Sequence, residues 1–141
     1  IMGVNLRGVY LMSMAMGKEM IKQRGGKVIN IASMGTYIGI PNASAYVASK
    51  GGVGQYTKNL AVEWAKYNIQ VNAIAPGYIE TDMTRPLKQN PERNEWVMMR
   101  TPARRWGQPE DLAGAAVFLA SAASDFITGH ILDVDGGFMA G

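Results

Sequence analysis

The run Lys27-Val28-Ile29-Asn30-Ile31-Ala32 follows the pair Gly25-Gly26 and is apolar almost throughout. An apolar run that does not alternate with polar residues is typical of a parallel strand covered on both faces. Ile69-Gln70-Val71-Asn72-Ala73-Ile74-Ala75 and Ile131-Leu132-Asp133-Val134 are two further strand candidates. Because helical patterns separate these runs, we predict an α/β fold with a parallel sheet and right-handed crossovers.

The segments between the predicted strands are expected to be helical. Residues 4–24 carry apolar side chains around more than half of the helical circumference, which predicts a helix buried on two sides. Residues 45–66 form a long helix, and another runs from Pro109 to about residue 120 with acids in its first turn. Residues 83–99 are polar and interrupted by two prolines, so we expect one or two short helices that form a mobile flap.

Tyr46 and Lys50 are the candidates for chemistry on the long helix. Residues i and i+4 share a helix face, so the phenol and the ammonium stand side by side and the charge favours the phenolate. Such a tyrosine passes a proton to or from a substrate oxygen at ordinary pH. Ser33 ends the first strand, where its hydroxyl is placed to hold the same oxygen. The alternative is a helix that presents a tyrosine and a lysine at its surface without function.

The position of the site follows from the predicted sheet. Ligands of parallel α/β sheets bind in the crevice at the carboxyl ends of the strands. Ser33 follows the first strand, and Pro76-Gly77 follows the second. We therefore expect these residues to share one crevice.

The composition argues against several classes of function. The chain of 141 residues has a formal charge of +3, and its scattered basic residues lack the stripe that nucleic-acid binding requires. There is no cysteine, which suits a reducing compartment, and we expect a cytoplasmic protein. No apolar run approaches the roughly 18 residues of a membrane span, so no membrane partner is expected. The single histidine, His130, lacks spaced ligand partners, so no metal site is expected.

Several motifs together resemble the short-chain dehydrogenase/reductase family, in its classical type, from Asn5 to Gly137. The family's catalytic asparagine, serine, tyrosine and lysine match Asn5, Ser33, Tyr46 and Lys50. Further matching stretches are Ile29-Asn30-Ile31-Ala32-Ser33, Asn72-Ala73-Ile74-Ala75-Pro76-Gly77-Tyr78-Ile79-Glu80-Thr81, Thr128-Gly129 and Val134-Asp135-Gly136-Gly137. The resemblance implies hydride transfer between a nicotinamide cofactor, NAD or NADP, and a carbonyl or secondary alcohol.

The resemblance also implies a role for each matching residue. Tyr46 would be the general acid/base and Ser33 would orient the substrate oxygen, so both would bind substrate. Tyr46 and Lys50 would both also bind the cofactor. Lys50 would favour the phenolate and hydrogen-bond the nicotinamide ribose, and Asn5 would hold a water that links Lys50 to solvent. The nicotinamide and its carboxamide would lie against four residues of the loop after the second strand. These are Pro76, Gly77, Ile79 and Thr81.

The substrate class is suggested by shorter stretches. Residues 63–72, 100–107 and 129–132 look most like gluconate 5-dehydrogenases and related sugar-acid oxidoreductases, whose substrates include gluconate and 5-ketogluconate. Residues 79–84 are as typical of 3-oxoacyl-carrier-protein reductases, which remain the alternative. A flap cation (Arg85, Lys88 or Arg93) is a candidate for a sugar-acid carboxylate, against a solvated surface charge as the plainer interpretation. A non-catalytic scaffold is a second alternative, because in the family the two apolar helices pair with symmetry mates in a homotetramer or dimer.

The family's amino-terminal features have no counterpart in this chain. No glycine-rich loop lies between a strand and a helix, where it would bind pyrophosphate. We therefore expect residues 1–141 to be the carboxy-terminal, catalytic portion of a single Rossmann-type domain, a doubly wound parallel sheet, with the amino-terminal cofactor-binding half absent. We also expect this polypeptide alone to bind cofactor poorly, and the choice between NAD and NADP stays open.

Overall fold

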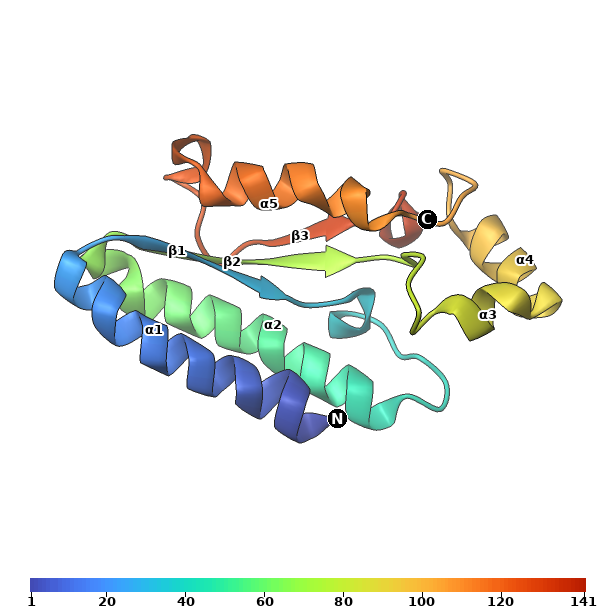
Figure 1. Cartoon of the computed structure of the whole chain (residues 1–141), viewed down its shortest axis with the longest axis horizontal. Helices are drawn as coiled ribbons and strands as arrows, with labels where there is room; N and C mark the ends of the chain where they lie inside the picture. Colours follow the sequence, from blue (N-terminus) through green and yellow to red (C-terminus); the bar gives the residue numbers. More distant parts are fainter.

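Three parallel strands form the central sheet of the computed structural model, which describes residues 1–141 (Figure 1). They are β1 (Gly26–Ile31), β2 (Ile69–Pro76) and β3 (Ile131–Val134), in the order β1-β2-β3. Val28 pairs with Val71, and Ala73 pairs with Ile131. The predicted parallel sheet is confirmed, and each predicted strand lies within one residue of its observed bounds.

Helices cover both faces of this sheet. The long helices α1 (Val9–Gln23) and α2 (Ser44–Trp64) lie together on one face, and α5 (Ala113–Ala120) lies on the other (Figure 1). The short helices α3 (Arg85–Gln89) and α4 (Pro91–Arg100) stand beyond the carboxyl ends of the strands, which confirms the two short helices expected there. The arrangement is doubly wound, as predicted.

The main core lies between the sheet and the pair α1 and α2. Val53 and Leu60 of α2 are fully or almost fully buried against β2, whose Val71, Ala73 and Ala75 are completely buried. β2 is therefore the central strand, and its continuous apolar sequence follows from having a neighbour on every side.

The first helix differs from its prediction in two ways. Residues Gly3–Gly8 form a π-helical segment that continues directly into α1. Only the side of α1 that faces α2 and β1 is covered. The expected contacts with a sheet and with another helix are present, but they cover less of the apolar circumference than predicted, because Val4 and Met12 remain 78% and 64% exposed. No helix combines the length and apolar character that crossing a membrane would require.

Candidate active site

Ser33 lies just past the carboxyl end of β1. Its backbone is extended, and it caps the short 3-10 helix Met34–Thr36 because its Oγ accepts a hydrogen bond from the Gly35 N–H at 3.1 Å. The side chain is only 7% exposed. The hydroxyl hydrogen of Ser33 donates to no group of the chain, so it is available to a ligand.

Tyr46 and Lys50 lie one turn apart on α2. The Lys50 ammonium is 5.9 Å from the centroid of the Tyr46 ring and donates a hydrogen bond of 2.7 Å to the carbonyl of Ile31, the last residue of β1. No carboxylate pairs with Lys50, and burial lowers the pKa of its ammonium. A positive charge is thus held at the end of β1, beside the phenol.

Gly35 shows that the serine and the tyrosine face one space. A methyl group built on Gly35 would lie 3.6 Å from Ser33 Oγ and 3.4 Å from Tyr46 Cε1. The two side chains therefore flank the same small volume, although they lie thirteen positions apart in the sequence. The same methyl group would lie 3.4 Å from Ile40 Cδ1, so the volume continues toward the loop that precedes α2.

Asn5 is connected to α2 through a buried serine. Its Nδ2 donates to Ser49 Oγ at 3.2 Å, and Ser49 Oγ donates to the Tyr46 carbonyl at 2.7 Å. Ser49 is completely buried. This contact fixes the π-helical segment against the turn of α2 that carries Tyr46 and Lys50, which agrees with the frequent occurrence of π-bulges at functional sites. Sequence reasoning missed Ser49, whose only signal was its place directly before Lys50.

The loop after β2 is held tightly against β3. The Gly77 N–H donates to the Val134 carbonyl at 3.0 Å, and a methyl group on Gly77 would lie 2.6 Å from the Asp135 Cα. Ile79 is 9% exposed and forms a parallel β-bridge with Gly107.

Thr81, further along this loop, is not packed against β3 but lies at the surface. Its hydroxyl lies 3.1 Å from the Thr84 hydroxyl and is exposed, so it already has a partner within the chain. Pro76, by contrast, lies at the end of β2 and is only partly exposed.

A pocket of about 630 Å³ opens between this loop, the loop before α2 and the flap helices. Its lining residues include Ile40, Tyr78, Arg93, Trp96 and Phe138. Tyr78 packs edge-on against Trp96 with 6.0 Å between ring centroids, and its centroid lies 5.6 Å from that of Phe138. Ile40 borders both this pocket and the space between Ser33 and Tyr46, so the two lie next to each other.

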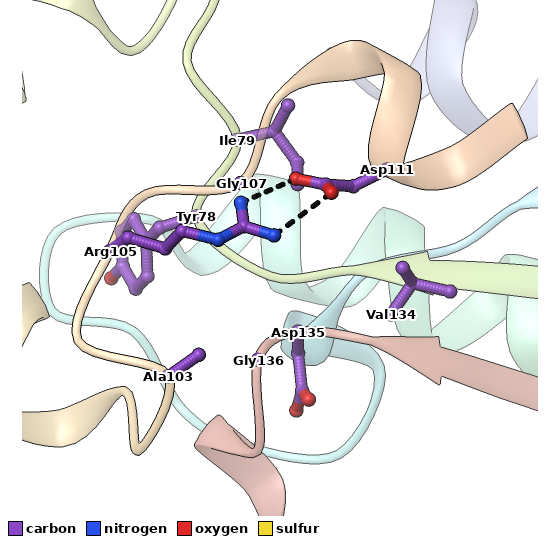
Figure 2. A pocket seen from close by; sticks show the side chains of 9 residues that line it. All are labelled: Tyr78, Ile79, Ala103, Arg105, Gly107, Asp111, Val134, Asp135 and Gly136. Carbon is purple, nitrogen blue, oxygen red and sulfur yellow. Dashed lines mark hydrogen bonds and ion pairs between the residues drawn. The ribbon is translucent and has the colours of Figure 1, made fainter.

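A second, smaller pocket of about 190 Å³ lies on the other side of Tyr78 (Figure 2). Figure 2 shows the Arg105 guanidinium turned toward Asp111, to which it donates two hydrogen bonds of 2.6 and 2.9 Å, while Asp135 points away. The ion pair lowers the pKa of Asp111 to about 2. Asp135 accepts from the N–H groups of Gly137 and Met139. The charges around this pocket already have partners, so it offers little to a charged ligand.

A groove of about 560 Å³ follows the outer edge of β1 and ends at the catalytic candidates. Asn5, Ile31 and Lys50 all line it. The Lys50 ammonium thus faces an open groove on one side and the Tyr46 ring on the other. No group of three or more histidine, cysteine, aspartate or glutamate side chains is arranged to hold a metal ion.

A doubly wound parallel sheet with serine, tyrosine and lysine side chains gathered at the carboxyl end of one strand is the architecture of a short-chain dehydrogenase/reductase. A family model described as enoyl-(acyl carrier protein) reductase matches residues 1–139, and the chain belongs to this branch of the short-chain dehydrogenase/reductase family.

Characterised relatives of the chain act on sugar acids. It is 49% identical over 139 residues to the 5-keto-D-gluconate 5-reductase of Escherichia coli K12, covering 99% of this chain and 55% of the relative. It is also 49% identical over 140 residues to the 2-dehydro-3-deoxy-D-gluconate 5-dehydrogenase of Bacillus subtilis 168, covering 99% and 55% of the two chains. The chain therefore spans about half the length of these relatives.

Solved structures give the same result for the fold. A gluconate 5-dehydrogenase from Burkholderia cenocepacia J2315, in complex with NADP and tartrate, superposes with a TM-score of 0.98 at 46% identity, covering 100% of this chain and 55% of that structure. The Rossmann-type fold predicted from the sequence is confirmed, and the chain corresponds to part of it.

Proposed function

We propose that the chain is the catalytic, carboxy-terminal portion of an NAD(P)-dependent oxidoreductase that interconverts the secondary alcohol and the carbonyl of a sugar acid, such as gluconate and 5-ketogluconate. The observation that carries this proposal is the shared space between the Ser33 hydroxyl and the Tyr46 ring, with the Lys50 ammonium beside it. The sugar-acid activities of the relatives support the substrate class.

In this proposal each side chain has a physical task. The Ser33 hydroxyl hydrogen, which has no acceptor in the chain, donates to the carbonyl oxygen of the substrate. Tyr46 gives its proton to the same oxygen during reduction and takes it back during oxidation. After the proton has left Tyr46, the positive charge of Lys50 stabilises the phenolate. When bound, the nicotinamide cofactor supplies or accepts the hydride.

The residues around Lys50 fit the nicotinamide and ribose part of such a cofactor. An ammonium without a carboxylate partner, facing an open groove, is a suitable donor to ribose hydroxyls. The tightly held loop Pro76–Ile79 offers a rigid wall for the nicotinamide.

The Thr81 hydroxyl already has Thr84 as a partner, and its remaining lone pair is suited to accept a hydrogen bond from the carboxamide N–H. The chain offers no glycine-rich phosphate loop, so we propose that the adenosine half is held by an amino-terminal part of the same domain. The unpaired outer edge of β1, where Ile31 is 50% exposed, supports a further strand there.

Two further parts of the proposal concern a water held by Asn5 and the association of the protein with copies of itself. The Asn5 side-chain oxygen takes no hydrogen bond within the chain, which suits a water that connects Lys50 to solvent. The exposed apolar side chains of α1, such as Met12, support a homotetramer or dimer built on this helix. The cytoplasmic location stays a prediction from the sequence.

The test is an assay of the full-length protein with gluconate, 5-ketogluconate and an acetoacetyl thioester, each with NADP and NAD. Structures of three similar proteins are described with NADP, so NADP is the first cofactor to measure. We expect turnover of the sugar acids. Turnover of the thioester alone would identify a 3-oxoacyl reductase instead, and no turnover with cofactor present would favour the scaffold.

A further inference from the structure

The three candidate cations of the flap have different surroundings. Arg85 forms an ion pair with Asp82, and Lys88 donates to Glu80 at 2.6 Å. Both charges therefore have a carboxylate partner within the chain. The Arg93 guanidinium forms no ion pair and no hydrogen bond within the chain, although its backbone N–H is fixed by the Asn90 side chain at the start of α4.

Arg93 lies on the wall of the pocket of about 630 Å³, and Ile40 separates this pocket from the space between Ser33 and Tyr46 by a single side chain. Burial raises the pKa of the Tyr78 phenol, Arg93 acts in the opposite direction, and Tyr46 adds to the increase. Tyr78 is thus within electrostatic reach of both the free guanidinium and the catalytic phenol. Tyr78 therefore connects the surroundings of Arg93 with those of Tyr46.

The rest of the pocket leaves Arg93 as its principal free charge. Most of the lining is apolar, including Ile38, Leu87 and Trp96. Arg100 also lines the pocket, but it donates to the Gly141 carbonyl at 3.3 Å and lies 5.1 Å from the centre of the Phe138 ring. No carboxylate lines the pocket to neutralise these cations. An unpaired guanidinium in such a place is suited to a planar anion, which it binds through two parallel hydrogen bonds.

We propose that Arg93 binds the carboxylate of the substrate while the carbonyl to be reduced lies between Ser33 and Tyr46. Arg93 is then the residue that makes the enzyme select sugar acids over neutral sugars. This inference rests on the proposed function and deepens it, because it assigns one end of the substrate to a named side chain. It also separates Arg93 from Arg85 and Lys88, which share its charge and its segment but already have partners.

The experiment compares two substrates that differ only at the carboxylate. 5-Ketogluconate and L-sorbose have the same carbon chain and the same ketone, but L-sorbose carries a hydroxymethyl group in place of the carboxylate. In the full-length protein with its cofactor, Arg93→Gln lowers kcat/KM for 5-ketogluconate by about 10- to 100-fold, mainly through KM. It leaves kcat/KM for L-sorbose unchanged, so the preference for the acid disappears. Arg93→Lys keeps part of the preference for the acid, because lysine retains the positive charge but lacks the planar guanidinium that forms two parallel hydrogen bonds.

Arg85→Gln is the matched control, since it removes the same charge from the same flap. It should leave the preference for the acid intact. Equal losses on both substrates, or equal effects of Arg93→Gln and Arg85→Gln, would overturn the assignment of Arg93 and leave the proposed function standing. If the unmutated protein reduces neither compound, the proposed function fails and the inference fails with it.

Discussion

Replacing Gly77 with alanine tests how the loop that follows β2 is held. The added methyl group would lie 2.6 Å from the Asp135 Cα, 2.8 Å from its Cβ and 3.1 Å from its carbonyl oxygen. These atoms cannot rotate away, because they belong to the backbone of Asp135, the residue directly after β3, or are bonded to that backbone. The ends of β2 and β3 must separate, which strains the hydrogen bond from Gly77 to Val134. Overpacking of this kind costs about 1–3 kcal/mol.

The assay is urea denaturation of the full-length protein, followed by circular dichroism, together with titration of NADP. Gly114→Ala on α5 is the matched control, because no atom lies within 4 Å of its added methyl group and alanine favours a helix by about 0.5–1 kcal/mol. We expect Gly77→Ala to unfold at lower urea than the parent and to bind NADP more weakly, and Gly114→Ala to unfold at slightly higher urea. A Gly77→Ala variant as stable as the control would refute the close approach of β3.

Two further substitutions test the structure around the sheet and the smaller pocket. Asn72→Ala removes a buried amide that donates to the Ile127 carbonyl at 2.8 Å and accepts from the His130 N–H at 3.0 Å, so it should lower the free energy of unfolding by about 2–4 kcal/mol. A loss no larger than that of the exposed Asn59→Ala, measured by urea titration, would contradict it. Asp111→Asn removes the ion pair with Arg105, which holds the pKa of Asp111 at about 2 instead of 3.8. The stability from this depressed pKa is complete above about pH 4 and is lost as the pH falls toward 2, so the difference in urea midpoint between parent and variant should narrow over that range. A difference in urea midpoint that stays constant between pH 7 and pH 2 would show that the Asp111–Arg105 ion pair does not stabilise the fold.

The fold was largely predictable because β1 and β2 have continuous apolar sequences, which are typical of parallel strands. β2 is buried along almost its whole length, whereas β1 is covered only in part because its outer edge has no neighbouring strand. The π-helical segment Gly3–Gly8 was not predictable, since it depends on how Asn5 meets α2 and not on local propensity. The exposed side of α1 was also missed. An apolar pattern predicts that a helix face is buried, but it does not distinguish burial within this chain from burial against another chain.

The candidate site was predictable where the chemistry is local. The i, i+4 spacing placed Tyr46 beside Lys50, and the end of a strand placed Ser33 near both. Hydrogen bonds that depend on how the loops and segments fold could not be predicted from local spacing. The acceptor of the Lys50 ammonium is a carbonyl at the end of β1, and the Thr81 hydroxyl is already shared with Thr84.

The flap cations illustrate the same limit. Their charges are visible in the sequence, but their partners depend on how the loops fold. Arg85 and Lys88 pair with Asp82 and Glu80, whereas Arg93 forms no ion pair.

The central claim is that the Tyr46 hydroxyl transfers the proton, and Tyr46→Phe in the full-length protein measures this most directly. The hydroxyl makes no hydrogen bond within the chain, so its removal leaves no buried partner and should leave the circular dichroism spectrum unchanged. Reduction of 5-ketogluconate should fall by about 10²- to 10⁴-fold in kcat. A folded Tyr46→Phe variant that reduces 5-ketogluconate at the parent rate would contradict the account.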